Sequence, residues 1–433
     1  MSSSPGGKPS SFSWSGWQDG LFPSLADHSS KKLDLLRDYI VLYLRIVCQN
    51  VHGKESQPIN FVDGFAGGGL YDGGHLGSPL VLLRAVEEAE AIINQGRTKK
   101  ITLTPTYYFI EKSTDAFACL ESTLKEQGYG HEIGKAIKLI RGDFTANAMA
   151  VADDICRRHP RGGGRTIFFL DQCGYVQVSP KLIAAVHERL SRKSEFIVNF
   201  AIDWLTDFLS HDTGYEQILT SLDIDRHVNL SELISLKKNL PDWRYIVEAK
   251  IGEALRAASG LPFFSPFYIE PEDNHRGYWL LHLAPVARAR AAMTTVHWKT
   301  ANRSRHYGPR GLGILHYKPE LDRSLYLDGM TFNDTTRKEC ADLLAEDLPR
   351  TIRDRFADGI SAKALEEYCT NRTVADFEMF TAAIWRLVDD QALRVTSPSG
   401  KLKRGRTLAP NDQIIFNTQM PLFSLPPVKA RSA

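Results

Sequence analysis

The sequence predicts an α/β fold: a doubly wound, mostly parallel sheet with a terminal antiparallel hairpin and a helical insertion, followed by a C-terminal winged helix-turn-helix domain. Short, nearly continuous apolar runs alternate with helical stretches, which indicates a parallel sheet covered by helices on both faces. Further along, two apolar runs flank a polar turn that ends in glycine, which predicts the hairpin. Near the end of the chain, helical patterns precede a second hairpin, which is typical of a winged helix.

The composition is that of a globular protein with more than one folded unit. The chain has 433 residues, of which 43% are hydrophobic, and its formal net charge of +2 argues neither for nor against nucleic acid. Its six cysteines show no short pair spacing, which favours reduced thiols over a disulfide framework or a zinc site. No run approaches the roughly 20 apolar residues of a membrane span. We therefore expect a cytoplasmic protein with no membrane segment and no metal site, and its oligomeric state stays open.

The first half of the chain predicts the tail and the parallel strands. Residues 1–30 are rich in Ser, Gly and Pro, and we expect a mobile tail from which Trp14, Trp17 and Phe22 are able to dock. Apolar residues then recur at helical spacing from residue 31 to 47. The predicted strands are 59–63, 106–111, 136–140, 166–171 and 195–200, and predicted helices begin near residues 78, 113, 144 and 179.

The second half predicts the insertion, the hairpin and a separate domain. The sheet domain extends over 31–330, with the helical insertion at about 205–258 and the hairpin formed by FFSPFYIEP and YWLLHLAP. A polar, turn-rich stretch at 318–335 predicts the domain boundary. Helical patterns at 339–356, 361–369 and 374–390 and a hairpin with a Ser-Gly turn then predict the winged helix-turn-helix domain over 336–420, and 421–433 form a second tail.

The most informative stretch is INFVDGFAGGG, in which a glycine cluster directly follows a buried strand. Glycines allow a backbone to approach a ligand, although a tight structural turn is the plainer interpretation. Asp63 ends the first strand, Glu111 the second and Asp171 the fourth, and Asp143 follows the third. Since ligands bind beyond the carboxyl ends of such strands, we expect these acids to line one crevice.

Two nucleotide-binding alternatives fit this stretch less well. GFAGGG lacks the Lys-Ser/Thr ending of a P-loop. The glycine spacing is not Gly-x-Gly-x-x-Gly, and the next strand-ending acid lies far more than about 20 residues downstream, which disfavours a dinucleotide oxidoreductase.

At these motifs the chain resembles Rossmann-fold S-adenosylmethionine-dependent methyltransferases. DGFAGGG is similar to their first motif, Glu111 to their second-strand acid, GDF at 142–144 to their third motif and FFLDQCGY to their fourth. The resemblance implies S-adenosylmethionine as the cofactor, with the glycines against its methionine half, Asp63 near the amino group, Glu111 at the ribose and Asp143 near the adenine. The cofactor-binding residues that it implies are Asp63, Gly64, Phe65, Ala66, Gly67, Gly69, Glu111, Lys112, Asp143, Phe144 and Asp171.

More narrowly, DGFAGGGLYDGGHLGSPL with FIEK and a terminal winged helix resembles the three-Cys-motif partner (TcmP) family over roughly residues 30 to 420. The family name implies association with a separate protein that carries a three-cysteine motif. The resemblance specifies the fold better than the reaction.

The predicted catalytic residues are Asp171 and Tyr175. Methyltransferases that act on amino groups of bases carry an Asp/Asn-Pro-Pro-aromatic tetrad, and here the tetrad is Asp171-Gln172-Cys173-Gly174 with Tyr175 next. An acceptor and a stacking ring are kept, but the missing prolines weaken the case for amine methylation. Cys173 is either a small buried residue or a nucleophile like that of cytosine-C5 enzymes.

Two basic stretches are candidates for nucleic-acid contact. Lys401, Lys403, Arg404 and Arg406 lie on the predicted wing, where a solvated charge run is the alternative. The stretch 296–317 holds histidines, arginines and tyrosines at loop-like spacing. The predicted recognition helix is acidic, which favours packing or protein contact because acids repel phosphates.

The sequence therefore predicts a methyltransferase that acts on nucleic acid, RNA or DNA, or next on a partner protein. The alternative is a methyltransferase-like body without catalysis that serves as a scaffold or as a nucleic-acid-binding adaptor for a three-Cys-motif partner.

Overall fold

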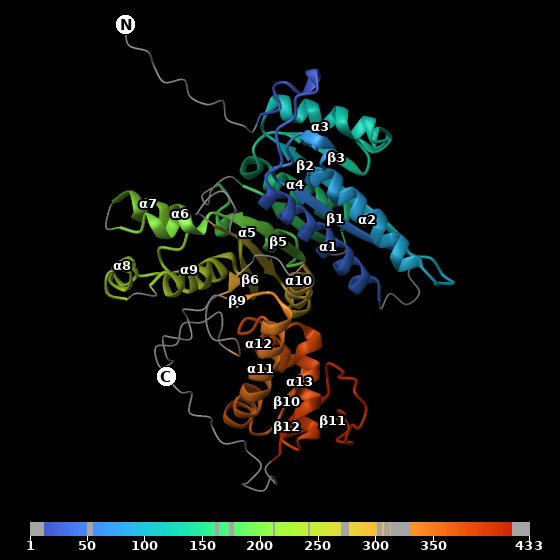
Figure 1. Ribbon diagram of the computed structural model, residues 1–433. Coiled ribbons are helices and arrows are strands. Elements are labelled where there is room, and N and C mark those ends of the chain that lie inside the picture. The colour runs from blue at the N-terminus through green and yellow to red at the C-terminus, as the bar shows by residue number, and fades with distance from the viewer. Residues whose placement is uncertain are drawn as a thin grey trace. The chain divides into compact units, whose positions relative to one another are not determined.

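The computed structural model describes residues 13–49, 55–160, 164–172, 177–210, 213–240, 243–269, 277–300, 305–306, 312 and 330–417. The chain divides into two compact units, Met1–His306 and Tyr307–Ala433 (Figure 1). The predicted boundary at 318–335 lies largely outside the described residues and stays a prediction.

The first unit contains a sheet in the order β3-β2-β1-β4-β5-β7-β6. Neighbouring strands from β1 to β5 run parallel, whereas β7 is antiparallel to both β5 and β6. The prediction of a doubly wound, mostly parallel sheet with a terminal hairpin is thereby confirmed. The strands are β1 (Ser56–Asp63), β2 (Thr102–Glu111), β3 (Ile137–Arg141), β4 (Arg165–Leu170), β5 (Ser194–Phe200), β6 (Phe263–Ile269) and β7 (Tyr278–Ala284), and the two-residue β8 (Arg305–His306) pairs with β6.

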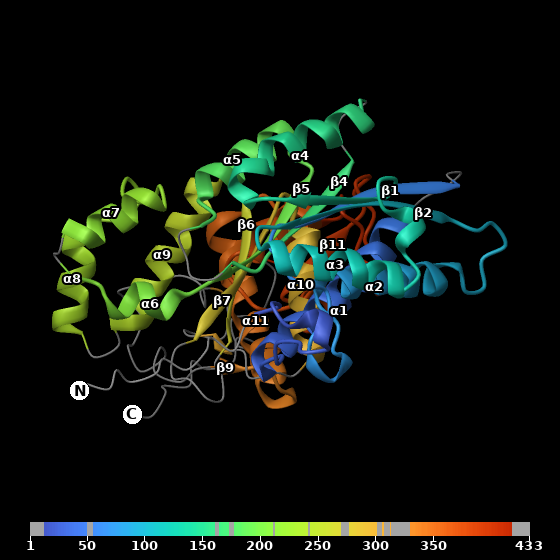
Figure 2. The same cartoon turned by 90° about the horizontal axis from the view of Figure 1, so that it is seen from above.

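Helices cover both faces of this sheet (Figure 2). One face carries α1 (Asp27–Gln49), α2 (Ser78–Asn94), α3 (Thr114–Glu126) and α10 (Ala287–Thr300), and the other carries α4 (Phe144–Arg158) and α5 (Pro180–Arg189). Side-chain caps begin three of them: Ser113 accepts from the Ala116 N–H, Asp143 from Thr145 and Ser179 from Leu182. Short 3-10 helices lie at Trp17–Asp19, Asp72–Gly74 and Gly130–Glu132.

The core lies between the strands and these helices because the strands are apolar on both faces. Phe168 of β4 and Phe196 of β5 stack with ring centroids 4.6 Å apart, and both are almost fully buried. The predicted helical insertion follows β5 as α6 (Ile202–Asp207), α7 (Thr213–Ser221), α8 (Leu230–Asn239) and α9 (Trp243–Ser259).

The N-terminal segment differs from the expected mobile tail within the described residues. Trp14 is 8% exposed and packs against Ala116 and Cys119 of α3, and α1 already begins at Asp27. The indole also donates from Nε1 to the Leu70 carbonyl at 3.2 Å. The docking of Trp14, which the sequence left open, buries a large aromatic surface, whereas its partners on α3 and at Leu70 were not predicted.

The expectation of loop-like spacing at 296–317 is wrong for its first residues. Residues 296–300 complete α10, and His297 within them is fully buried. Val296 and Trp298 are buried beside it, so packing of the helix on the sheet determines the local structure. Most of the remaining stretch lies outside the described residues.

The second unit has the element order that the sequence predicts for its helices and hairpin. Antiparallel strands pair in the order β10-β12-β11. The name winged helix-turn-helix stays an interpretation of this arrangement. The elements are β9 (Met330–Thr331), α11 (Asp334–Arg355), β10 (Ile360–Ser361), α12 (Ala362–Thr370), α13 (Phe377–Asp389), β11 (Leu393–Thr396) and β12 (Gln413–Phe416).

Candidate functional site

The site lies where the strand order of the sheet reverses, between β1 and β4. Chain connections leave β1 toward β2 on one side, while β4 is followed by β5 on the other. Asp63 is the last residue of β1, and Asp171 directly follows β4. In the register Asp63 lies opposite Phe169, so both acids reach the same edge of the sheet. Open α/β sheets bind ligands in the crevice at such a reversal.

The glycine loop after β1 is tied to both neighbouring strands. The Gly64 N–H donates to the Phe169 carbonyl of β4, and the Ala66 N–H donates to the Ile110 carbonyl of β2, each at 3.0 Å. Gly67 has a φ of 60° and Gly69 a φ of 79°, a conformation that favours glycine. The backbone of the loop therefore has one defined conformation across the crevice.

Contacts with protein atoms account for the glycines of this loop. A Cβ on Gly64 would lie 2.6 Å from the Leu170 Cδ2, and a Cβ on Gly69 would lie 2.9 Å from the Leu120 Cδ1. A Cβ on Gly68 would lie only 2.2 Å from the Trp14 Nε1. Packing thus explains why side chains are excluded, and a ligand would meet the loop through backbone atoms.

Asp63 combines complete burial with an unpaired oxygen. Its Oδ1 accepts from the Phe65 N–H at 3.1 Å, while its buried Oδ2 has no hydrogen-bond partner among the described residues. Burial raises the pKa of Asp63 to about 7, against the lowering effect of hydrogen bonds from the Ser78 side chain and the Phe65 N–H, and the charges of Asp171 and Glu111 add to the rise. An ammonium group at Oδ2 would satisfy this acceptor and favour the charged form.

Glu111 joins the glycine loop to the start of α3. Its Oε2 accepts from the Gly67 N–H at 2.8 Å, and its Oε1 accepts from the Ser113 N–H at 2.6 Å. The structure thus brings together two residues that the sequence placed in one site. Since a carboxylate has about four acceptor positions, Glu111 keeps positions for further donors.

The remaining predicted cofactor residues differ in their surroundings. Asp143 accepts from the Thr145 N–H at 2.9 Å and forms a 3.4 Å ion pair with Lys112. Its pKa is lowered, chiefly by the hydrogen bond from the Thr145 hydroxyl. Phe144 is a core residue, 2% exposed, whose ring packs against Phe65 and Phe168.

Asp171 has a partner that sequence reasoning missed. Lys32 of α1 donates from Nζ to both carboxylate oxygens, at 2.6 and 2.8 Å. Lys32 is 5% exposed, and its Nζ also lies 5.3 Å from the centre of the Tyr278 ring. A lysine on the same helical face as Leu36 was the available signal, but its target is 139 positions away.

Two amides beside Asp171 add unpaired buried atoms. Asn199 of β5 donates to the Gln172 carbonyl at 3.2 Å, and Gln172 accepts from the Val178 N–H at 2.9 Å. Within the described residues, the Gln172 Nε2 and the Asn199 Oδ1 have no hydrogen-bond partner. Tyr175 and Cys173 lie outside the described residues, so their predicted roles stay predictions.

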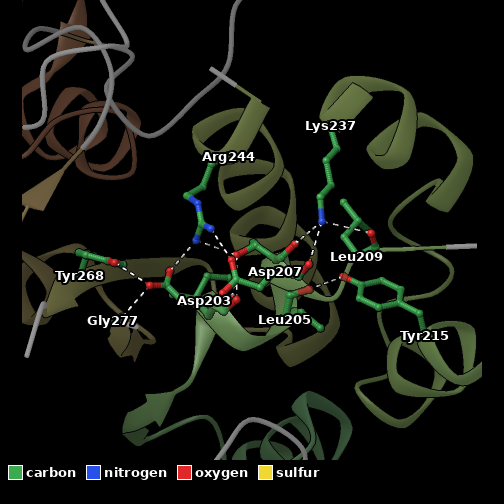
Figure 3. Close-up of polar contacts among 11 residues, drawn as sticks. Asp203, Leu205, Asp207, Leu209, Tyr215, Lys237, Arg244, Tyr268 and Gly277 are labelled. Atoms are coloured by element: carbon green, nitrogen blue, oxygen red, sulfur yellow. Dashed lines mark hydrogen bonds and ion pairs between the residues drawn. The ribbon is translucent and has the colours of Figure 1, made fainter. Parts of the chain in front are cut away.

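The short helix α6 is fixed directly beyond β5 by charged groups (Figure 3). Buried Asp203 accepts from the Tyr268 hydroxyl at 2.7 Å, the Gly277 N–H at 2.6 Å and Arg244 at 3.0 Å. Arg244 also pairs with Asp207, and burial raises the pKa of Asp203. Lys237 donates to the carbonyls of Thr206 and Asp207, which end the helix, and to that of Leu209 beyond it.

The four predicted nucleic-acid-binding residues of the second unit fall into two pairs. Lys403 lies 2.6 Å from the almost fully buried Asp412, and Arg406 lies 2.9 Å from Asp389. Lys401 and Arg404 are exposed and have no acidic partner among the described residues. Of the four predicted residues, only Lys401 and Arg404 therefore take part in no ion pair with another described residue.

Two further features lie apart from this crevice. A cavity of about 390 Å³ between β3 and α4 is lined by Lys138, Asn147 and Arg157, among others, and by none of the predicted site residues. In the described ranges, no cluster of three His, Cys, Asp or Glu side chains has the arrangement of a metal site. None of the helices in the part of the chain that the structure describes has the length and apolar character needed to cross a bilayer.

Comparison with known proteins identifies related folds only. No protein-family model and no curated protein matches the chain, so the resemblance to the TcmP family stays a prediction. Solved structures that match include cofactor-bound Rv0187 from MTB, at 11% identity over 57% of this chain and 79% of that one, with a TM-score of 0.27. Loganic acid methyltransferase with SAH matches at 8% identity over 63% and 82%, with a TM-score of 0.26.

A longer match is Trm1 from Pyrococcus horikoshii in complex with S-adenosyl-L-methionine. It is 11% identical and covers 87% of this chain and 91% of that one, with a TM-score of 0.28. Likeness at this level carries no statement about substrate or reaction.

Proposed function

We propose that this chain is an S-adenosylmethionine-dependent methyltransferase whose cofactor binds at the glycine loop, beyond the ends of β1, β2 and β4. The observation that carries the proposal is the buried, unpaired Asp63 Oδ2 at the reversal of strand order. It offers an acceptor to the ammonium group of the methionine half. When bound, S-adenosylmethionine supplies a methyl group on a cationic sulfur.

The other residues of the crevice fit this ligand. Glu111 lies at the loop with acceptor positions left for ribose hydroxyls, and Asp143 lies beyond β3 where the adenine is expected. Carboxylates around the crevice favour a cationic ligand over a nucleotide phosphate. Asp171, at the end of β4, is the proposed catalytic residue near the transferred methyl group.

The proposed methyl acceptor is nucleic acid, with a partner protein as the next choice. A TcmP-like association with a three-Cys-motif protein belongs to the same proposal. The second candidate function is a non-catalytic scaffold or nucleic-acid-binding adaptor. Two observations favour it: Asp171 is already paired with Lys32, and the glycines already pack on protein atoms.

Calorimetry with S-adenosylmethionine and with its demethylated product tests the cofactor assignment. We expect both to bind without added metal. Glu111→Ala should weaken binding by about 1 to 3 kcal/mol, because it removes an acceptor and releases the Gly67 N–H. The control is Glu121→Ala on α3, which removes only a surface pair with Lys125.

The outcomes separate the two candidate functions. Binding that Glu121→Ala preserves and Glu111→Ala weakens supports a cofactor site at the loop. Wild-type protein that binds neither ligand favours the scaffold. If wild type and Glu111→Ala bind the cofactor with equal affinity, Glu111 is not part of the cofactor site.

A further inference from the structure

Lys32 holds a positive charge at the edge of the sheet where the acceptor would react. Its Nζ is within hydrogen-bond distance of both oxygens of Asp171, and the side chain is 6% exposed against 28% for Asp171. Lysines normally extend their ammonium groups into water. An ammonium this deeply buried beside the proposed catalytic carboxylate calls for a functional explanation.

The helix that carries Lys32, α1, is anchored to strands of the sheet by a buried tyrosine. Tyr39 of α1 is fully buried and donates to the Glu195 Oε2 of β5 at 2.5 Å. The His282 Nε2 of β7 lies 3.2 Å from the same hydroxyl. Burial raises the pKa of Tyr39 well above its ordinary value, so this hydroxyl stays a donor. The anchor fixes α1, and with it the position of Lys32 at the carboxyl ends of the strands.

A fixed ammonium distinguishes between the two common kinds of methyl acceptor. An amine acquires positive charge as its lone pair takes the methyl group, so a cation beside it raises the barrier. A hydroxyl oxygen acquires negative charge as it loses its proton, so the same cation lowers the barrier.

We propose that Lys32 is a catalytic residue that adapts this site to a hydroxyl acceptor, and that the acceptor is a ribose hydroxyl of RNA. The inference rests on the proposed function above. RNA follows from the chemistry, because among nucleic acids only RNA carries a hydroxyl at each nucleotide of the chain. Lys32 acts by orienting Asp171 and by directing its remaining N–H toward the acceptor oxygen.

The reaction balances with the groups at hand. The acceptor oxygen forms a bond to the methyl carbon as the carbon–sulfur bond breaks, and the electron pair of that bond stays on sulfur. The hydroxyl proton passes to the Asp171 carboxylate, whose exposed part returns it to water. The ammonium of Lys32 stabilises the negative charge on oxygen along this path.

The test uses full-length protein, S-adenosylmethionine with a labelled methyl group, and cellular RNA, DNA and protein fractions. We expect label in RNA, recovered after alkaline hydrolysis as alkali-stable dinucleotides, because methylation of the ribose hydroxyl blocks cleavage of the adjacent phosphodiester. Lys32→Met should lower the rate of transfer by about 100-fold or more, on the scale of losing one oriented donor. Its affinity for S-adenosylmethionine should change by less than about threefold, and Lys32→Arg should restore part of the rate.

The control is Arg37→Met, which removes a surface ion pair between α1 and Glu88 and should leave transfer unchanged. A purely structural role for Lys32 predicts parallel losses of transfer, cofactor affinity and thermal stability, without rescue by arginine. If Lys32→Met does not fold, the pH–rate profile of Lys32→Arg against wild type decides, since only a role at Asp171 predicts a displaced profile.

The results that would contradict the inference differ from those that would contradict the proposed function. Label in methylated base amines, in DNA or in protein, or transfer by Lys32→Met at the wild-type rate, overturns the inference and leaves the cofactor assignment standing. Cofactor binding with no labelled fraction also overturns it. Absence of cofactor binding by wild type overturns the proposed function, and this inference with it.

Discussion

At the scale of single residues, burial determines what the carboxylates of the crevice do. Asp63 was recognisable in the sequence as a strand-ending acid, but its unpaired oxygen and its pKa of about 7 follow from the apolar surroundings. Asp143, which the sequence grouped with it, is half exposed and caps a helix. Two acids that the sequence placed at one edge of the sheet therefore have opposite pKa shifts.

The raised pKa of Asp63 predicts a pH dependence of the free energy of unfolding. Between about pH 4 and pH 7 the folded state holds a proton that the unfolded state releases, so stability is present below about pH 4 and is lost as the pH rises to about 7. The loss is on the order of 4 kcal/mol for a shift of about 3 units. Asp63→Asn should remove this part of the slope, as measured by urea unfolding at pH 4.5, 6 and 8.

The control for Asp63→Asn is a substitution that removes a carboxylate outside the crevice. Asp115→Asn, in the exposed first turn of α3, is the matched control. An unchanged slope in Asp63→Asn would mean that the Asp63 carboxyl is solvated. A slope changed equally in both variants would assign the effect to net charge.

At the scale of elements, the glycine loop and α6 show how neighbouring elements fix the edges of the crevice. The loop is confined between β4, α3 and the docked Trp14, and α6 is held through Asp203, Arg244 and Lys237 (Figure 3). Sequence periodicity predicted the strand before the loop and a helical insertion. The contacts that hold both elements come from distant positions, so no local pattern contained them.

The contact between Trp14 and the loop predicts the effect of adding one methyl group. Gly68→Ala should displace the indole, since its Cβ would lie 2.2 Å from the Trp14 Nε1, and should lower stability by about 1 to 3 kcal/mol. Thermal unfolding and tryptophan fluorescence measure both effects. Gly405→Ala, where no atom lies within 4 Å of the added Cβ, should leave both unchanged. Equal behaviour of the two variants would contradict the docking of Trp14.

The anchor of α6 predicts a second loss of stability. Arg244→Met should cost about 1 to 3 kcal/mol in urea unfolding, because it leaves the buried Asp203 with one partner fewer. Arg256→Met on the same helix removes only a local pair with Glu253 and should have a smaller effect. If the two substitutions cost the same, the Asp203 pair adds nothing specific to the position of α6.

At the scale of the whole molecule, the two units carry different kinds of candidate site. The first unit contains the crevice, and the second contains the basic hairpin on which nucleic-acid contact was predicted. The ion pair of Lys403 with buried Asp412 changes the design of the test, because its removal would disturb folding. Among the four predicted residues, Lys401 and Arg404 are those whose charge can be removed without breaking an ion pair between described residues.

Lys401→Gln with Arg404→Gln should weaken nucleic-acid binding if the hairpin contacts phosphates. The slope of log affinity against log salt should fall by about 1.5 for two lost contacts. Fluorescence anisotropy with single-stranded RNA and duplex DNA measures it. Lys99→Gln with Lys100→Gln removes the same charge from an exposed loop of the first unit and controls for net charge. An equal slope in wild type and the hairpin variant would assign these two residues to solvent.

The sequence by itself determined the parts of this protein that depend on neighbouring residues. Apolar runs and helical periodicity predicted the parallel strands, the helices and the terminal hairpin. This was possible because the pattern of buried side chains in a strand or helix extends over only a few neighbouring residues. The same pattern placed Asp63, Glu111 and Asp171 at strand ends. Parallel strands bring their carboxyl ends to one edge, so the crevice followed from topology alone.

Only the tertiary structure decided which groups meet there. Lys32 reaches Asp171 across 139 positions and Trp14 reaches Leu70 across 56, and neither contact follows from a local pattern. Whether Asp63 is charged depends on its burial, and whether Asp171 meets an ammonium depends on the packing of α1, which carries Lys32. Electrostatic energies depend on distance and burial in three dimensions, so the chemistry of the site was decided by the fold.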